Sequence, residues 1–413
     1  MARIDTVIIG GGQAGLAMSR CLSGLGIEHV VLERGKVAQR WRSQSWDSLH
    51  LLTPNWMTRL PGFEYDGDEG DGYMSAAELI GFLERYAISS EAPVITDTDV
   101  QSVERSVDGF RVATNRGIWW ASFVVVATGY CDRPAVPAVS RSLSPSVRQM
   151  VPTDYRRPEQ LPAGGVLIVG ASSTGVQLAN EIQRSGRQVT LAVGRHTRLP
   201  RRYRGHDIFS WLDRLGVLSQ SAGAVHNIER SRHQPSLQLV GRADHSSLDL
   251  AVLHDRDVRL VGRVRDIDGD RVTLADDLAA TTAAADIKMA EILTRIDQFV
   301  NTNGIAATPP EEFDQTARLA ADTPRCLDLK DERIDTVIWA TGYRRAYPWL
   351  RLPIFDFRGE IMHKDGVTPA GGLYVLGLNF QRRRNSSFID GVGDDAWVIA
   401  GEIARSMGRA RVA

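Results

Sequence analysis

The chain has 413 residues, of which 43% are hydrophobic and 24% are charged, and its formal net charge is -1. This length allows two or three domains, and the near-neutral charge gives no reason to expect nucleic acid or an anionic membrane as a partner. No apolar run approaches the ~20 residues of a membrane-spanning helix, and a first strand beginning near Ile4 leaves no room for a secretion signal, so we expect a cytoplasmic enzyme.

The first element in the chain is a nucleotide-binding βαβ unit. The run VIIGGGQAGLAMSRCLSGLGIEHVVLERG places three glycines between a buried strand and a helix. Such glycines permit a tight turn, approach of the backbone to a pyrophosphate and close helix packing, while an acid after the second strand binds a ribose diol. The predicted cofactor-binding residues of this unit are Gly10, Gly12, Gln13, Ala14, Gly15, Glu33 and Arg34.

A long segment without clear periodicity, from Arg40 to Tyr73, comes next, and its tryptophans argue against disorder. Loops of this length inside a domain are usually functional when they are ordered. A helix near residues 75–86 and a strand at residues 123–127 lead to the tetrapeptide Ala127-Thr128-Gly129-Tyr130. Several prolines between residues 134 and 162 then predict a crossing between domains.

A second glycine loop begins at residue 166, in VLIVGASSTGVQLANEIQRSGRQVTLAVGRHTRLPRR. Its predicted cofactor-binding residues are Gly170, Ser172, Ser173, Thr174, Gly175 and Arg195. An arginine after the second strand favours a dinucleotide with a 2′-phosphate, and Arg198, Arg201 and Arg202 extend the cationic segment. The alternative is that these arginines form a solvated loop.

Residues 277–327 interrupt the α/β pattern. Apolar residues at three- and four-residue spacing predict one helix, and the sequence Thr308-Pro309-Pro310-Glu311 predicts the start of a second helix that runs toward Ala321. The apolar stripe comprises Met289, Ile292, Leu293, Ile296, Phe299 and Val300. It either covers core or forms a lid or the surface of a homodimer.

The chain then returns to strand at residues 336–340, followed by a second tetrapeptide Ala340-Thr341-Gly342-Tyr343, and it ends in a helix. Asn379, which follows a strand, is a further predicted cofactor-binding residue, and the adjacent Arg382, Arg383 and Arg384 either bind an acidic substrate or form an exposed basic turn. We therefore predict an α/β fold with two Rossmann-like domains. Residues 1–155 and 328–413 form a discontinuous first dinucleotide-binding domain, residues 160–276 an inserted second dinucleotide-binding domain, and residues 277–327 a helical insertion.

The order of these motifs resembles the class B flavin-dependent monooxygenases and their auxin-forming relatives. The resemblance implies FAD on the first loop and NADPH on the second, with O2 forming a flavin C4a-(hydro)peroxide that oxygenates a small organic substrate. It also implies that Trp41, Ala127, Thr128 and Gly129 lie near FAD and that Thr341, Gly342 and Tyr343 lie toward the domain cleft. Asn55 is the candidate catalytic residue. In the linker, Tyr155 fits the family pattern, but Val151 stands where a histidine is expected.

Two other functions stay open. One is an NADPH-dependent flavoprotein reductase that passes electrons to a partner or quinone, and the other is an NADPH-occupancy sensor without turnover. A disulfide reductase is disfavoured because Cys21, Cys131 and Cys326 are far apart and form no CxxC motif. The scattered histidines show no metal-ligand spacing, so we predict no metal.

Overall fold

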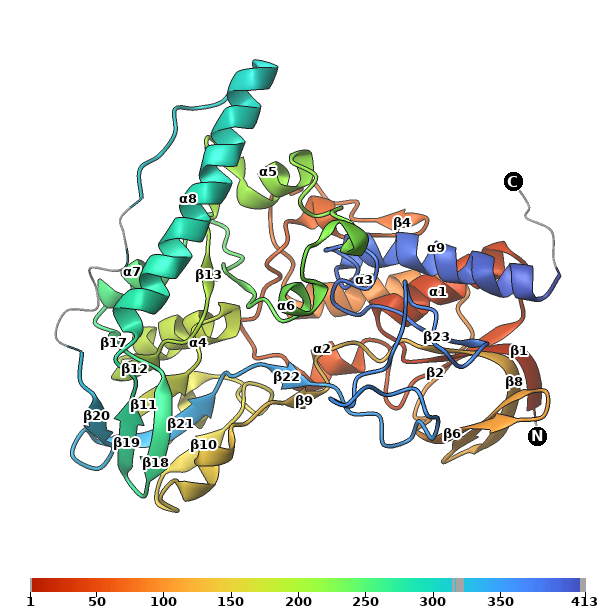
Figure 1. The fold of residues 1–413 in the computed structure, drawn as a ribbon, viewed down its shortest axis with the longest axis horizontal. Coiled ribbons are helices and arrows are strands. Elements are labelled where there is room, and N and C mark those ends of the chain that lie inside the picture. Colours follow the sequence, from red (N-terminus) through yellow and green to blue (C-terminus); the bar gives the residue numbers. More distant parts are fainter. Residues whose placement is uncertain (1, 314–315, 317–322, 409–413) are drawn as a thin grey trace.

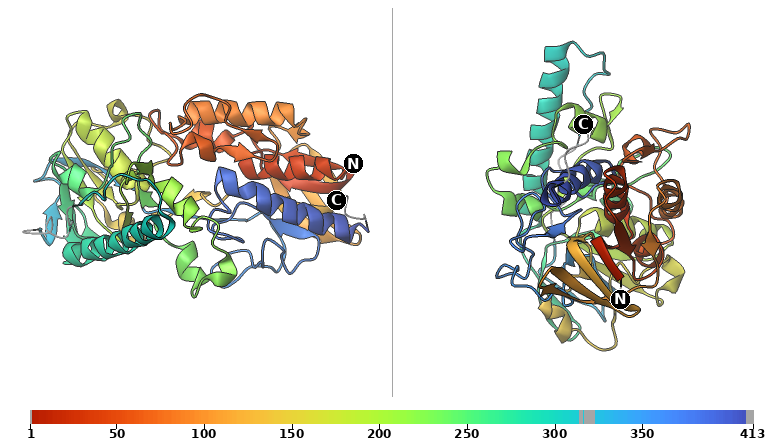
Figure 2. Two further views of the ribbon diagram at one scale, coloured as in Figure 1. Left: turned by 90° about the horizontal axis from the view of Figure 1, so that it is seen from above. Right: turned by 90° about the vertical axis from the view of Figure 1, so that its right-hand side faces the viewer.

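The computed structural model describes residues 2–313, 316 and 323–408. The molecule is elongated, with one large sheet toward each end of its long axis (Figure 1). Both described chain ends lie beside the first sheet, and the long helix α8 lies at the opposite end (Figures 1 and 2).

The first sheet is assembled around β1 (Ala2–Ile9) and β8 (Gly117–Val126), which run parallel. Its order is β5 (Val94–Ile95), β2 (His29–Leu32), β1, β8, β7 (Gly109–Thr114) and β6 (Val100–Ser106). The last three form an antiparallel meander, and β23 (Leu373–Val375) pairs with the second half of β8. The continuous apolar runs at β1 and the end of β8 are those of strands covered on both faces.

Helices cover one face of the first sheet, and a long connection covers the other. The helices are α1 (Gln13–Gly24), α3 (Ala76–Ser89) and α9 (Ile389–Ser406), which share one apolar core. Residues 347–373 supply side chains such as Tyr347 and Leu350 to the core on the opposite face. The short α2 (Gln39–Gln44), η1 (Asn55–Met57), β3 (Arg59–Leu60) and β4 (Phe63–Glu64) lie in the long segment between β2 and α3.

The second sheet has five parallel strands. Their order is β10 (Arg148–Met150), β21 (Ile334–Trp339), β11 (Gly165–Val169), β12 (Val189–Ala192) and β17 (Arg259–Val261). One face is covered by α4 (Ser173–Arg184) and α7 (Leu250–His254). The other is covered by the antiparallel strands β18 (Val264–Asp268), β19 (Arg271–Leu274) and β20 (Cys326–Asp328).

Sheet membership corrects the predicted domain boundaries. The strand predicted at residues 336–340 is β21, and it pairs with β10 and β11 in the second sheet, not in the first. Residues 148–150 and 326–339 therefore belong with the second sheet, although the sequence analysis placed 1–155 and 328–413 in the first domain. The chain crosses between domains at β9 (Arg133–Pro134) and returns at β22 (Tyr343–Arg344), and these two strands pair antiparallel.

A third apolar core lies outside both sheets. Between β12 and β17 the chain leaves the second sheet, and we call residues 197–249 the cap segment. It contains β13 (Thr197–Arg198), β14 (Arg202–Tyr203), β15 (His206–Asp207), α5 (Ile208–Arg214), α6 (Ile228–Arg232) and β16 (Leu237–Gln238). Its core also takes Met57 from the first domain and side chains of α8 (Leu278–Asn303).

The predicted first helix of the insertion is present as α8, and its stripe covers the core of the cap segment. The predicted second helix is wrong over residues 308–313, which are not helical. Glu311 Oε2 accepts a hydrogen bond from the backbone N–H of Arg204 at 2.7 Å, so a tertiary contact replaces the predicted capping box. The remainder of that predicted helix falls largely outside the described residues.

Candidate cofactor-binding site

The first glycine loop leaves β1 at the carboxyl edge of its sheet. Gly10 has φ +112°, and a Cβ there would lie 2.6 Å from the carbonyl oxygen of Ala127. A Cβ on Gly15 would lie 1.8 Å from the Gly10 carbonyl oxygen, so α1 packs on β1 only with glycine there. A Cβ on Gly12, in contrast, would meet no described heavy atom within 4 Å. Gly12 therefore borders open space at the N-terminus of α1, where backbone N–H groups favour an anion.

Glu33 ends β2 beside this loop. Its Oε2 accepts a hydrogen bond from Gly11 N at 2.6 Å, and its Oε1 accepts one from Gly35 N at 3.0 Å. The side chain is buried, whereas the neighbouring Arg34 is exposed. The carboxylate thus lies where a ribose contact is predicted. Its two hydrogen bonds also join the glycine loop to the turn that follows β2.

The second glycine loop repeats this geometry. Gly170 has φ +111°, and a Cβ there would lie 2.3 Å from the carbonyl oxygen of Ala340. A Cβ on Gly175 would lie 1.8 Å from the Gly170 carbonyl oxygen. Ser172 is the N-cap of α4 and is partly exposed with Thr174, while Ser173 is turned inward. Each loop therefore leads from a parallel strand into the N-terminus of a helix, which is α1 for the first sheet and α4 for the second.

The arginines after β12 divide into two groups. Arg195 and Arg202 are exposed. Arg198 is buried and forms ion pairs with Asp249 at 2.9 Å and Asp286 at 2.7 Å. This correction removes Arg198 from the predicted cationic segment, because its charge is already paired within the protein.

Arg201 is also withdrawn from solvent, and it joins the cap segment to the first domain. It donates to the Leu52 carbonyl at 2.7 Å and to Asp207 at 2.6 Å, and its guanidinium stacks over the Tyr73 ring. The Tyr73 hydroxyl donates to the other oxygen of Asp207 at 2.7 Å.

The sequence analysis did not single out Arg263, which the fold brings to the same edge as Arg195. Its side chain is exposed, passes Gly194 and pairs with Asp277. Arg263 lies two residues after β17, and β17 is the neighbour of β12 in the sheet. Its position after that strand is the signal in the sequence that could have identified it.

The two Ala-Thr-Gly-Tyr turns lie beside the two glycine loops. Ala127 and Ala340 each contribute the carbonyl that packs on the first glycine of the neighbouring loop. Gly129 (φ +77°) and Gly342 (φ +88°) each border space that is free of described atoms within 4 Å of a Cβ. Thr341 Oγ1 donates to the Ala135 carbonyl at 2.7 Å, which joins the two crossings between domains.

The remaining predicted residues are dispersed around the first loop. Trp41 lies on α2 and packs against the core beneath α1. A Cβ on Gly377 would lie 3.0 Å from the Ala14 Cβ, so the segment that leads to Asn379 passes the start of α1. Asn379 Oδ1 accepts a hydrogen bond from Ser387 Oγ at 2.9 Å.

Asn55 lies apart from these residues. It is buried at the start of η1, and its Nδ2 donates to the Glu69 carbonyl at 2.9 Å. Its backbone bonds to Gly72 and Thr58, so these hydrogen bonds hold Asn55 within its own loop. Asn55 Oδ1 has no hydrogen-bond partner among the described residues.

The arginine run near the C-terminus is neither an exposed basic turn nor a free cationic patch. Arg382 pairs with Asp395, and Arg383 pairs with Asp394. Arg384 donates to Gln220 and Gln234 of the cap segment. Backbone hydrogen bonds also join residues 218–222 to residues 382–385, so this run attaches the cap segment to the first domain.

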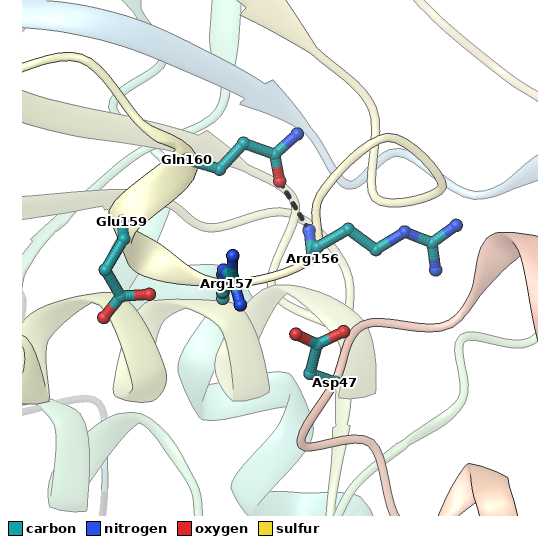
Figure 3. Close-up of a pocket in the computed structure, with 5 residues that line it drawn as sticks. All are labelled: Asp47, Arg156, Arg157, Glu159 and Gln160. Carbon is teal, nitrogen blue, oxygen red and sulfur yellow. Dashed lines mark hydrogen bonds between the residues drawn. The ribbon is translucent and has the colours of Figure 1, made fainter.

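The linker forms an open pocket of about 500 Å³ with the loop at Asp47 (Figure 3). Arg157 lies between Glu159 and Asp47 in this view, and the Arg156 N–H donates to Gln160 Oε1 at 2.8 Å. The adjacent Tyr155 is fully buried and donates to Glu181 of α4 at 3.0 Å. Tyr155 therefore anchors the linker to the second domain.

Two further observations concern other classes of site. Within the described ranges, no cluster of three or more histidine, cysteine or acidic side chains could hold a metal ion. No helix in the described part of the chain is long and apolar enough to cross a membrane. All three cysteines are free, and Cys21 is buried in the core beneath α1.

Comparisons with known proteins agree with this geometry. The pyridine nucleotide-disulphide oxidoreductase family model matches residues 7–212. An uncharacterized CzcO-like oxidoreductase from Geobacillus kaustophilus is 32% identical over 97% of this chain and 98% of its own length. The indole-3-pyruvate monooxygenase YUCCA1 of rice is 26% identical over 90% of this chain and 86% of its own.

Among solved structures, a flavin-containing monooxygenase from Stenotrophomonas maltophilia superposes with a TM-score of 0.69 at 20% identity. The match covers 98% of this chain and all of that one. The predicted α/β fold with two dinucleotide-binding units is confirmed.

Proposed function

Because the chain belongs to the family of CzcO-like oxidoreductases, we propose that it is a flavin-dependent monooxygenase that consumes NADPH and O2 to oxygenate a small organic substrate. The observation that carries this proposal is the pair of matched glycine loops, each beside an Ala-Thr-Gly-Tyr turn whose glycine borders open space. FAD and NADPH are the cofactors of this class of fold. Two sites on one chain suit a reaction in which one cofactor reduces the other.

We assign FAD to the first loop. The open space at Gly12 and Gly129 fits a bound pyrophosphate and the chain that leads from it. The Glu33 carboxylate would exchange its contact with Gly11 for the ribose hydroxyls. Bound FAD would supply hydride acceptance and reaction with O2, whereas the residues around Trp41, Ala14 and Asn379 would position it.

We assign NADPH to the second loop, with the pyrophosphate at Ser172 and Thr174 and the 2′-phosphate beside Arg195. Arg263 lies on the same edge, and its exposed guanidinium would exchange its ion pair with Asp277 for a share of the phosphate beside Arg195. Gly342, at the second turn, would border the nicotinamide half on the side of the domain crossing.

The cap segment would keep water out of the space between the cofactors. It is attached to the first domain by Arg201 and by the pairing of residues 218–222 with residues 382–385. A closed site protects reactive oxygen chemistry from wasteful release of hydrogen peroxide. Three expectations stay predictions: that Asn55 is the catalytic residue, that the protein is cytoplasmic and that it forms a homodimer.

The test is to reduce the purified yellow protein with NADPH in the absence of oxygen, then to mix it with oxygenated buffer and a panel of amines, sulfides, ketones and 2-oxo acids. A monooxygenase gives rapid flavin reduction and, with a substrate, one oxygenated product and little hydrogen peroxide per NADPH. Stoichiometric peroxide with every compound, together with fast turnover on quinones, would favour a reductase. Absence of reduction by NADPH would favour an NADPH sensor.

A further inference from the structure

A groove of about 490 Å³ lies between the β3–β4 hairpin and α9. We call it the hairpin groove. Its α9 wall consists of Asp390, Gly393, Asp394 and Trp397, which share one helix face. None of its lining residues is among those assigned to FAD or NADPH above. The groove is therefore distinct from the two cofactor loops, and its own chemistry has to be explained.

The inner wall carries a buried carboxylate that is only weakly paired. The Asp390 side chain is 3% exposed, and its nearest cation is Arg59 at 3.9 Å, whose own side chain is 51% exposed. Asp390 Oδ1 has no hydrogen-bond partner in the described part of the chain. A buried charged group without full partners is costly, so a cation that reached this carboxylate from the groove would relieve that cost.

The surroundings of Asp390 act in opposite directions on the pKa of its carboxyl group. Burial raises the pKa of Asp390 to about 6, and Asp213 of α5 also raises it, while Arg59 and Arg383 lower it. Asp390 lies in the first turn of α9, where the helix dipole stabilises a negative charge. The carboxylate is therefore ionised at neutral pH, yet close enough to its pKa to report on a cation that binds beside it.

The rest of the lining suits an organic cation. Three carboxylates line the groove, Asp390, Asp394 and Glu64, against the single guanidinium of Arg59. Asp394 is already paired with Arg383 at the rim. The lining also includes Trp397, which is 46% exposed. Aromatic rings attract cations and cover their apolar substituents.

We propose that the hairpin groove binds a small organic ammonium ion, which pairs with the carboxylate of Asp390 once that side chain turns toward the groove, and lays its apolar body against Trp397. A protonated primary amine on a short aromatic body fits this combination of groups. The site goes beyond the proposed oxygenation, and binding there requires no turnover.

The experiment is isothermal titration calorimetry of the FAD-loaded protein with 2-phenylethylammonium, 2-phenylethanol and phenylacetate as matched cationic, neutral and anionic probes. We expect only the ammonium to bind measurably at pH 7.5. Asp390→Asn should weaken that binding by about 10- to 100-fold, because a charge-assisted hydrogen bond is lost. Glu402→Gln, on the same helix but outside the groove and paired with Arg405, is the matched control and should change it by less than about threefold.

The pH dependence separates this site from a nonspecific acidic surface. Protonation of Asp390 below about pH 6 should weaken the ammonium complex by up to about tenfold for each further pH unit, and Asp390→Asn should abolish that dependence. Equal binding of the ammonium and the alcohol would overturn the proposal, as would wild-type affinity in Asp390→Asn or no binding by the folded wild type. These outcomes are read without NADPH or O2, so they do not depend on the proposed function.

Discussion

Gly12 and Gly15 lie one helical turn apart, yet a side chain at each would meet different surroundings. At Gly15 a Cβ would overlap the Gly10 carbonyl, whereas at Gly12 it would enter open space. Gly12 has φ -91°, which any residue can adopt. The fold itself therefore leaves room for a side chain at position 12, and in our proposal the bound pyrophosphate takes up that room.

We predict that Gly12→Val gives a folded protein that retains no FAD, because the valine occupies the place assigned to the pyrophosphate. Gly15→Val should fail to fold or should lose several kcal/mol of stability from the overlap, in the range of about 1–3 kcal/mol or more for overpacked cores. The ratio of flavin to protein absorbance and the circular dichroism melting curve distinguish the two. A yellow, fully loaded Gly12→Val protein would refute the assignment of FAD to this loop.

Arg195 is the exposed arginine directly after β12, and its charge is available to a ligand. Arg195→Ala should raise the KM for NADPH by about 10- to 100-fold, because one charge-assisted hydrogen bond contributes about 1.5–3 kcal/mol. The KM for NADH should stay within about twofold. Steady-state kinetics with both nucleotides is the measurement, and Arg202→Ala, another exposed arginine of the same segment, is the control. A similar loss for NADPH and NADH would contradict a 2′-phosphate contact.

The roles of these arginines show where prediction from sequence reaches its limit at the residue scale. The spacing of glycines, strand and helix was sufficient to place both loops, because these are local requirements of the backbone. The sequence offers no comparable signal to separate Arg195 from Arg198 and Arg201. Apart from Asp207, which is near Arg201 in the chain, the named partners of the two buried arginines are Asp249, Asp286 and the Leu52 carbonyl, and only the tertiary fold brings these near.

At the scale of elements, α8 was predictable and its continuation was not. The apolar stripe at three- and four-residue spacing has the helical period, and it is buried as expected. Thr308 and Glu311 also had a helix-starting pattern, but both contact the turn at Arg204 and Gly205 of the cap segment. A local capping signal was overridden by a contact with residues about a hundred positions earlier in the chain.

Ile296 lies at the centre of the α8 stripe and is fully buried. Ile296→Ala should lower the free energy of unfolding by about 2–5 kcal/mol, the range for truncation of a buried isoleucine. Ile287 on the same helix is 61% exposed, so Ile287→Ala should change it by less than about 0.5 kcal/mol. Urea unfolding of both variants is the measurement. Equal effects would mean that the stripe does not hold α8 on the cap segment.

At the scale of the whole molecule, the division into two dinucleotide-binding domains was predictable, whereas their exact membership was not. The strand β21 follows the helical insertion and precedes the second tetrapeptide, so its order in the chain suited either sheet. It lies beside β11 in the second sheet. Neighbouring parallel strands of one sheet need not be consecutive in the chain, so the order of elements does not settle the pairing. The cap segment was missed because its short helices and two-residue strands have no sustained period.

Stability as a whole should depend on pH through the buried acid Asp395. Its side chain is fully buried, and burial raises its pKa to about 6, although Ser386, Arg382 and Arg383 lower it in part. The folded protein thus binds this proton more tightly than the unfolded chain, where the pKa is about 3.9. The associated stability is present below about pH 4 and is lost as pH rises through about 6.

We therefore expect wild type to lose stability relative to Asp395→Asn between about pH 4.5 and pH 7.5. Urea unfolding of both proteins at these two pH values gives the difference directly. Asp390 titrates in the same range in both proteins, so its contribution to the free energy of unfolding cancels in the difference. A difference in unfolding free energy that is constant with pH would contradict the raised pKa of Asp395.

The pairing of β9 with β22 means that the chain leaves and re-enters the first domain at a single place. Pro134 lies opposite Tyr343, and Arg133 opposite Arg344. Strands paired in this way have Cα atoms about 5 Å apart, a gap that one short turn can close. In topological terms, the second domain is a detachable module whose two ends coincide. Recombination could exchange it for another nucleotide-binding module through one junction, with the cap contacts at Arg201 and residues 382–385 as the surface that a replacement would have to match.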